Sequence, residues 1–88
     1  MKVVYKKRFL KELAKIPSEQ RRKIEHFVFA EAPNLTSLSQ SRSVKKLKGF
    51  QTYYRVRFGD YRVGLNFEDN TLTFERVAHR KDIYRVFP

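Results

Sequence analysis

The ten residues YYRVRFGDYR, positions 53 to 62, decide the fold of this chain. Large apolar and polar side chains alternate from residue 53 to residue 58, which is the period of a β-strand with one buried face. Gly59 and Asp60 then form a two-residue hairpin signal, and the alternation resumes beyond them. The stretch therefore predicts two antiparallel strands with one apolar face and one polar face.

Three arginines, Arg55, Arg57 and Arg62, share the polar face of this hairpin. Residues i and i+2 of a strand lie about 6.7 Å apart on one face, and Arg62 is within a diagonal cross-strand step of the other two. The planar guanidinium group suits bidentate binding of phosphate. An ordinary solvated strand face remains the alternative, but such a face usually mixes both charge signs, and no acidic residue occurs from Ala32 to Gly59.

Around the hairpin, the hydrophobic pattern predicts a strand at residues 2–5 and two one-sided helices within residues 6–17 and 18–32. The polar residues that follow predict a surface connector. After the hairpin, a third strand begins near Leu72, and a slip in its alternation predicts a β-bulge at residues 75–77. The chain then closes on a short helical turn.

These elements predict an α+β fold with a single domain over residues 1–88. An N-terminal strand and a two-helix hairpin pack on a twisted, mainly antiparallel four-stranded sheet, and a short C-terminal helical turn follows it. The helices are expected to cover the apolar face of the sheet. The arginine face is expected to be left uncovered by the rest of the chain.

The composition restricts the class of protein. Twenty Lys and Arg against nine Asp and Glu give a net charge of +11, which indicates a polyanionic partner such as nucleic acid or an acidic protein. The chain has no cysteine, which excludes disulfides and fits a reducing cytosol. It also lacks an apolar stretch long enough for a signal peptide or a membrane span, so a cytoplasmic location is expected. Neither a cofactor nor a metal site is predicted, because the two histidines lie far apart in the sequence and no acidic cluster accompanies them.

Other candidate functional residues lie on either side of the hairpin. His79 can transfer protons near neutral pH, Arg80 adds a cation, and Tyr84 has a phenol that donates or accepts a hydrogen bond. Taken singly, His79 is equally consistent with a structural histidine and Tyr84 with an aromatic anchor of the tail. Three lysines before the hairpin form the candidate RNA-binding set: Lys45, Lys46 and Lys48.

The segment from Val44 to Arg85 resembles the RelE/ParE superfamily of type II toxin–antitoxin toxins, specifically its RelE-like branch. The matching motifs are a Leu-x-Gly stretch at residues 47–49, Gly-x-Tyr-Arg at residues 59–62, and Ala-His-Arg at residues 78–80 followed by Tyr84. The preceding strand and helical hairpin also match the family fold, so the resemblance covers nearly the whole chain.

The resemblance implies a ribosome-dependent endoribonuclease that cleaves mRNA in the decoding site and thereby inhibits translation. A cognate acidic antitoxin would hold it inactive, with a toxin–antitoxin heterotetramer as one expected assembly. In RelE-like enzymes the 2′-hydroxyl attacks the adjacent phosphate. The resemblance implies a catalytic set that comprises Arg55, Arg57, Arg62, His79, Arg80 and Tyr84.

This chain departs from the family at the strand positions, where relatives often carry lysine. Arginine does not lose its proton in proteins, so Arg55 and Arg57 can act only electrostatically. Proton transfer is then expected from His79, with Tyr84 as its partner. Two alternatives stay open: a ParE-like toxin that inhibits gyrase through protein binding, and a non-catalytic RNA- or ribosome-binding protein.

Overall fold

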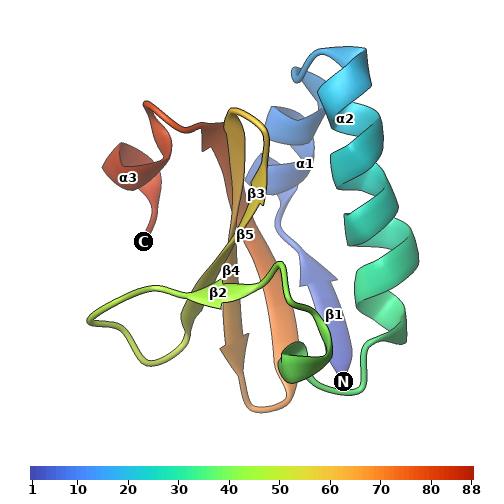
Figure 1. The fold of residues 1–88 in the computed structure, drawn as a ribbon, viewed down its shortest axis with the longest axis vertical. Helices are drawn as coiled ribbons and strands as arrows, with labels where there is room; N and C mark the ends of the chain where they lie inside the picture. Colours follow the sequence, from blue (N-terminus) through green and yellow to red (C-terminus); the bar gives the residue numbers. More distant parts are fainter.

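A computed structural model describes all residues from 1 to 88. The N-terminal strand is followed by two helices, and the second continues without a break into a π-helical turn, His26–Glu31, and a 3₁₀ turn, Ala32–Asn34 (Figure 1). None of the helices is long and apolar enough to cross a membrane. The strands and α-helices are β1 (Lys2–Tyr5), α1 (Lys7–Ala14), α2 (Ser18–Glu25), β2 (Lys45–Lys46), β3 (Tyr53–Phe58), β4 (Tyr61–Glu68), β5 (Thr71–His79) and α3 (Ile83–Val86).

One sheet with the strand order β1-β5-β4-β3-β2 forms the centre of the molecule. β2 to β5 pair in antiparallel fashion, whereas β1 pairs with β5 in parallel. The mainly antiparallel α+β prediction is confirmed, but the sheet has five strands and not four. The additional strand is β2, which has only two residues, and such a short strand leaves no alternation to detect in a polar connector.

The predicted β-bulge is confirmed in β5. Gly64 pairs with Arg76 and Leu65 pairs with Phe74, so that Glu75 has no partner on β4. The bulge explains why the alternation slips there, because one extra residue on one strand changes the face on which later side chains lie. Glu75 instead forms ion pairs with Lys6 and Arg8 at the start of α1, with N–O distances of 2.9 and 3.5 Å.

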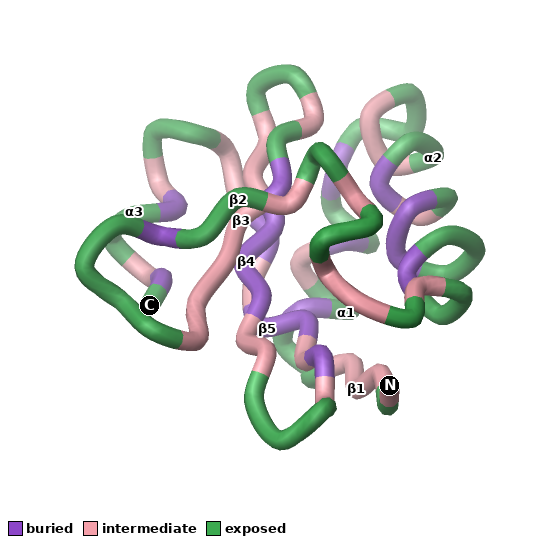
Figure 2. The backbone as a smooth tube through the Cα atoms, turned by 60° about the horizontal axis from the view of Figure 1, so that its bottom comes forward, coloured by how far each residue is buried: buried purple, intermediate pink, exposed green.

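The main core lies between the sheet and the helices α1 and α2. It combines the apolar face of β3, β4 and β5 with the inner faces of both helices, and its largest fully buried side chains include Phe9, Phe74 and Ile24. Figure 2 shows buried residues along β4 and along one side of α2. The amphipathic stripes of the two helices therefore pack as the sequence predicts.

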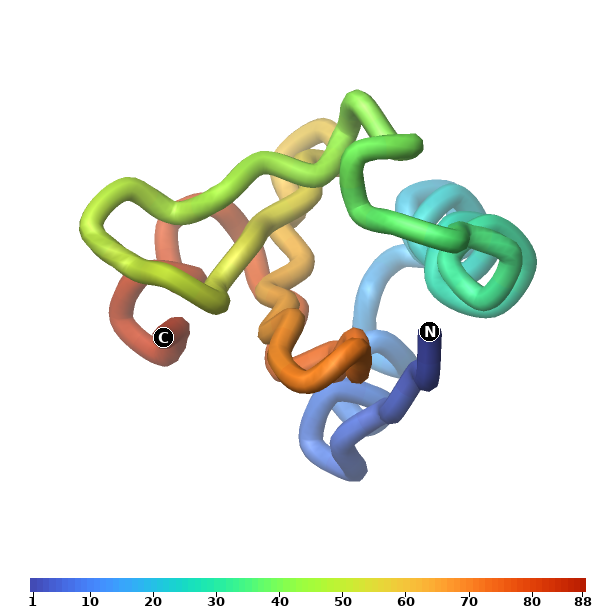
Figure 3. Tube along the Cα trace, turned by 90° about the horizontal axis from the view of Figure 1, so that it is seen from below, coloured from blue at the N-terminus to red at the C-terminus, as the bar shows by residue number.

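The opposite face of the sheet is not left open, contrary to the prediction. α3 and the last residues fold back over it, and Ile83 and Phe87 are buried there against Leu47 in a second, smaller core. In Figures 1 and 3 the C-terminal segment lies on the side of the sheet away from α2. The tail fits because Gly64 has no side chain: the ring of Phe87 occupies the space that a Cβ atom would fill.

Candidate functional site

The β3–β4 hairpin brings the three predicted arginines together on one face. Arg57 lies directly across from Arg62 in the strand register, and Arg55 lies across from Gly64. Like charges that face each other across a strand pair destabilise it, by about 0.2–1 kcal/mol. The hairpin tolerates this repulsion, and the charges of its arginines are concentrated on one face.

Arg62 is at the centre of this arginine cluster. Its guanidinium group donates hydrogen bonds to the carbonyl oxygens of Gly59, at 2.6 Å, and Tyr61, at 3.0 Å, so the turn of the hairpin orients it. Burial lowers the pKa of Arg62 below its usual value, and the charge of Arg57 lowers this pKa further. The side chain therefore carries a partly desolvated charge, which attracts an anion more strongly than a fully hydrated one.

Arg80, which directly follows β5, and Tyr84, which lies in α3, complete the cluster. The charges of Arg55 and Arg80 also lower the pKa of Arg62, whereas Tyr84 raises it, and no carboxylate acts on it. Arg80 is positioned by Asp60, whose carbonyl oxygen accepts its backbone N–H at 2.7 Å. An ion pair at 3.4 Å also joins the side chains of these two residues, and both side chains are more than half exposed. The guanidinium of Arg80 is thus available to a ligand, since an exposed pair of this kind contributes little.

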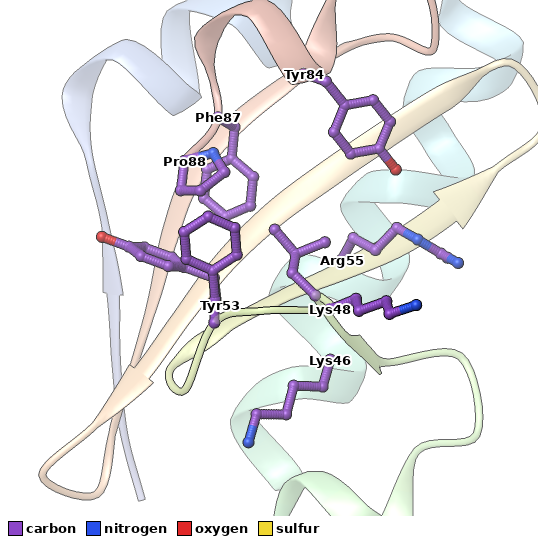
Figure 4. A pocket seen from close by; sticks show the side chains of 9 residues that line it. Lys46, Lys48, Tyr53, Arg55, Tyr84, Phe87 and Pro88 are labelled. Carbon is purple, nitrogen blue, oxygen red and sulfur yellow. The ribbon is translucent and has the colours of Figure 1, made fainter.

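Tyr84 is exposed and is not an anchor of the tail. Its relative accessible surface is 62%, whereas its neighbour Ile83 and Phe87 are buried. The short segment of α3 and Phe87 buries two side chains and presents Tyr84 to solvent, which leaves that ring free to contact a ligand. Figure 4 shows the hydroxyl end of Tyr84 directed toward the side of the groove where Arg55 lies.

His79 is placed differently from the other candidates. It pairs with Tyr61 across β4 and β5, one position away from the Arg62–Ala78 pair, so it lies on the opposite side of the sheet from Arg62. Its ring packs edge-on against Tyr61 at 5.6 Å between centroids, and its Nδ1 accepts the backbone N–H of Lys81 at 3.2 Å. These contacts hold the ring of His79 at the end of β5, away from the face that carries the arginines.

Two of the three candidate lysines, Lys45 and Lys46, form β2, and Lys48 follows it by two residues. Lys45 lies across from Arg55 in the β2–β3 register. Lys46 and Lys48 line a groove of about 850 Å³ between the loop after β2 and the C-terminal segment. Figures 2 and 3 both show that loop beside the C-terminal segment. The groove also reaches Arg55, so it is continuous with the arginine cluster (Figure 4).

The sequence analysis did not identify the aromatic lining of this groove. Its aromatic side chains come from three separate stretches of the chain: Phe50, Tyr53, Tyr84 and Phe87. The rings of Phe50 and Phe87 each lie nearly perpendicular to that of Tyr53, at centroid distances of 5.7 and 5.4 Å. An isolated Phe in a polar loop gives no sequence signal of this kind. Only the repeated occurrence of aromatic residues beside lysines could have indicated it.

Known proteins match this chain over nearly its full length. The sequence model of a family described as "ParE toxin of type II toxin-antitoxin system, parDE" matches residues 3–84. Toxin RelE3 of Methanocaldococcus jannaschii is 42% identical over 89 residues, which cover 100% of both chains.

Solved structures match as well. A chain of the RelB-RelE antitoxin-toxin complex from Methanococcus jannaschii has a TM-score of 0.81 and 39% identity, and the match covers 97% of this chain and 99% of that one. The RelBE2 toxin-antitoxin complex of Mycobacterium tuberculosis has a TM-score of 0.66 and 24% identity, with coverages of 90% and 96%, which shows the shared fold.

Proposed function

The chain belongs to the ParE toxin family of the RelE/ParE superfamily and is a RelE-like toxin of a type II toxin–antitoxin system, and we propose that it is an endoribonuclease that cleaves mRNA on the ribosome. The observation that carries this proposal is the arginine cluster on one face of the β3–β4 hairpin, where Arg57 lies across from Arg62, and Arg55 lines the groove together with the exposed Tyr84. This arrangement suits a transition state whose negative charge grows on a phosphate.

In the proposed reaction, the 2′-hydroxyl oxygen of one nucleotide attacks the phosphorus atom that joins it to the next. The bond from O2′ to phosphorus forms, the bond from phosphorus to O5′ breaks, and the products are a cyclic phosphate and a free 5′-hydroxyl. One proton leaves the 2′-hydroxyl and one is delivered to O5′. The phosphorane carries more negative charge than the substrate, so fixed cations stabilise it selectively.

Roles in this reaction follow from the chemistry of each side chain. Arg55, Arg57, Arg62 and Arg80 are assigned to phosphate binding and charge stabilisation, because arginine keeps its proton. We assign proton transfer to the exposed phenol of Tyr84, acting with groups of the ribosome or the substrate, because His79, which the sequence predicts for this role, lies on the other side of the sheet from Arg62. Lys45, Lys46 and Lys48 are assigned to the RNA backbone, where their contribution depends on salt concentration.

A matched pair of arginine variants tests the enzymatic proposal. Arg80 and Arg85 are both exposed and both pair with an aspartate, Asp60 and Asp82 respectively, but only Arg80 belongs to the cluster. We expect Arg80→Gln to abolish cleavage of a reporter mRNA, measured by primer extension after induction, while Arg85→Gln cleaves like the wild type. If Arg80→Gln cleaved the reporter as well as Arg85→Gln does, the arginine cluster would have no part in the reaction.

We also propose that an acidic antitoxin binds this chain and neutralises the cluster. The net charge of +11 supports such a partner, and so do the matched toxins that were solved as complexes with antitoxins. A heterotetramer is the proposed assembly. Co-expression with the adjacent reading frame, followed by co-purification and mass measurement, tests both statements. A free monomeric toxin recovered from that experiment would contradict them.

A second candidate function is inhibition of DNA gyrase, because the matching family model describes a ParE toxin. The two functions give opposite results after induction without antitoxin. The ribonuclease arrests translation and leaves plasmid supercoiling unchanged, whereas a gyrase inhibitor produces double-strand breaks while mRNA stays intact.

A further inference from the structure

We propose that the groove beside the arginine cluster is a subsite in which a nucleobase of single-stranded RNA stacks on the ring of Phe50. The inference rests on the proposed function, because it supplies the base-recognising part of the same RNA-binding surface. It adds a ligand class, an unpaired base, and it gives a role to Phe50 and Tyr53, to which neither the family motifs nor the phosphate chemistry assigns one.

The first supporting observation is the exposure of Phe50. Its relative accessible surface is 45%, and its ring lies nearly perpendicular to that of Tyr53, at 5.7 Å between centroids. Single exposed apolar residues are common and need no explanation. Here, however, the exposed ring lines a groove of about 850 Å³ together with Tyr53, Phe87 and Tyr84, and a volume of this size is within the range of ~300–1,000 Å³ found for ligand sites.

The second observation is the charge of the same groove. Lys46, Lys48 and Arg55 contribute to its lining, and none of its lining side chains is acidic. An apolar peptide segment needs no cations beside it, whereas a nucleotide offers a flat base and an anionic backbone together. Aromatic rings interleaved with basic side chains are the usual surface for single-stranded nucleic acid.

The third observation is continuity with the phosphate-binding residues. Arg55 and Tyr84 line the groove and also act on Arg62 electrostatically. Figure 4 shows Tyr84 and Arg55 on one side of the groove and Tyr53 on the other. An RNA strand whose scissile phosphate lies at the arginine cluster can therefore place a neighbouring base between the C-terminal segment and the loop that contains Phe50.

The rigidity of the aromatic lining supports the same conclusion. Tyr53 is held between Phe50 and Phe87 in two edge-to-face contacts, and Phe87 is buried against Gly64. Because the ring of Phe50 packs on this fixed Tyr53, it has less conformational entropy to lose when a base stacks on it. Stacking is sequence-tolerant, because every base has a flat π-face, so the subsite would bind any of the four bases with modest preferences.

The test uses a 2′-O-methyl RNA trinucleotide that contains 2-aminopurine, whose fluorescence is quenched by stacking. The methyl group blocks the attacking hydroxyl, so binding is measured without cleavage. We expect Phe50→Ala to weaken binding about 5- to 150-fold and to abolish the quenching. Phe29→Ala is the matched control, because Phe29 is exposed to nearly the same extent, 46%, and does not line the groove.

An abasic trinucleotide of the same length separates base binding from phosphate binding. Phe50→Ala should leave its affinity unchanged, and Phe50→Trp should preserve quenching of the 2-aminopurine probe. Identical behaviour of the Phe50→Ala and Phe29→Ala variants would overturn the inference. It would equally be overturned if Phe50→Ala weakened only the binding of an antitoxin and not of RNA, because the groove would then accept an apolar peptide. Failure of the ribonuclease proposal is seen separately, as intact reporter mRNA with base-dependent binding retained.

Discussion

Substitution of Gly64 by alanine tests how the C-terminal segment positions Tyr84. An ideal Cβ atom on Gly64 would lie 2.7 to 2.8 Å from three ring carbons of Phe87. Carbon atoms in contact are normally about 3.5–4.0 Å apart, so the ring has to move by roughly 1 Å. The Gly64 backbone is not in the left-handed region, so the alanine causes no backbone strain.

The magnitude follows from the two ways in which the clash can be relieved. If Phe87 shifts within the second core, overpacking costs about 1–3 kcal/mol of unfolding free energy. If the tail detaches instead, the loss is the burial of the Phe87 side chain, which contributes about 1.5–3 kcal/mol. Both routes leave the main core intact, so the variant should still fold with a stability lowered by about 1–3 kcal/mol.

The effect on activity should be larger than the effect on stability. Tyr84 precedes Phe87 by three residues in the same short segment, and a misplacement of about 1 Å at a reacting group can cost roughly 100-fold in rate. We therefore expect Gly64→Ala to reduce mRNA cleavage by about this factor. Urea unfolding gives the stability, and primer extension on a ribosome-bound reporter gives the cleavage rate.

The control is a double variant in which Phe87→Leu provides room for the new methyl group. Its urea midpoint should exceed the value that the two single variants predict by addition, because the clash disappears. The reasoning would be refuted if Gly64→Ala had the stability and cleavage rate of the wild type. It would also be refuted if Phe87→Leu gave no recovery.

Further expectations concern charge and the ties between elements. Arg57→Thr should raise the unfolding free energy by up to about 1 kcal/mol, because it relieves the repulsion across the Arg57–Arg62 pair. The same variant should reduce cleavage. A lowered unfolding free energy would contradict this prediction. Glu12→Gln should lower stability by about 1–3 kcal/mol, since the half-buried Glu12 accepts from the Arg76 guanidinium at 2.6 Å and from the Val77 N–H at 3.1 Å, and cleavage by the folded fraction should be unaffected. Burial raises the pKa of Tyr5 above 10.0, and its hydroxyl donates to the Val28 carbonyl at 3.0 Å. This contribution is intact below pH 10.0 and is lost as the pH rises through the folded-state pKa, so the urea midpoint of the wild type should fall more steeply at alkaline pH than that of Tyr5→Phe; parallel curves would contradict it.

Most of the fold could be predicted because local patterns report the face on which each side chain lies. The alternation of residues 53–58 and the slip near residue 75 predicted both the β3–β4 hairpin and the bulge. β2 could not be predicted, since two residues are too few to show an alternation of apolar and polar side chains. That α3 and the last residues cover the second face of the sheet could not be predicted either, because the packing depends on a contact between Gly64 and Phe87, which are 23 positions apart in the chain.

The candidate site shows the same division between local and distant information. Arg55, Arg57 and Arg62 could be placed together from strand geometry alone, since they belong to one hairpin. Strand geometry alone could not show that His79 lies on the other face of the sheet from these arginines, because that placement depends on the β4–β5 register as well as on the bulge. The aromatic groove could not be predicted at all, since its lining comes from the loop after β2, from β3 and from the C-terminal segment.

The sequence by itself determined the hairpin, its cationic face and the excess of positive charge, because alternation and charge are properties of neighbouring residues. The tertiary structure alone decided that α3 covers part of that face, that the exposed Tyr84 lines a groove with Arg55, and that His79 lies on the other side of the sheet. The physical reason is that side chains far apart in the chain meet only after register and packing have been chosen. Those choices depend on the whole core and not on any one segment of it.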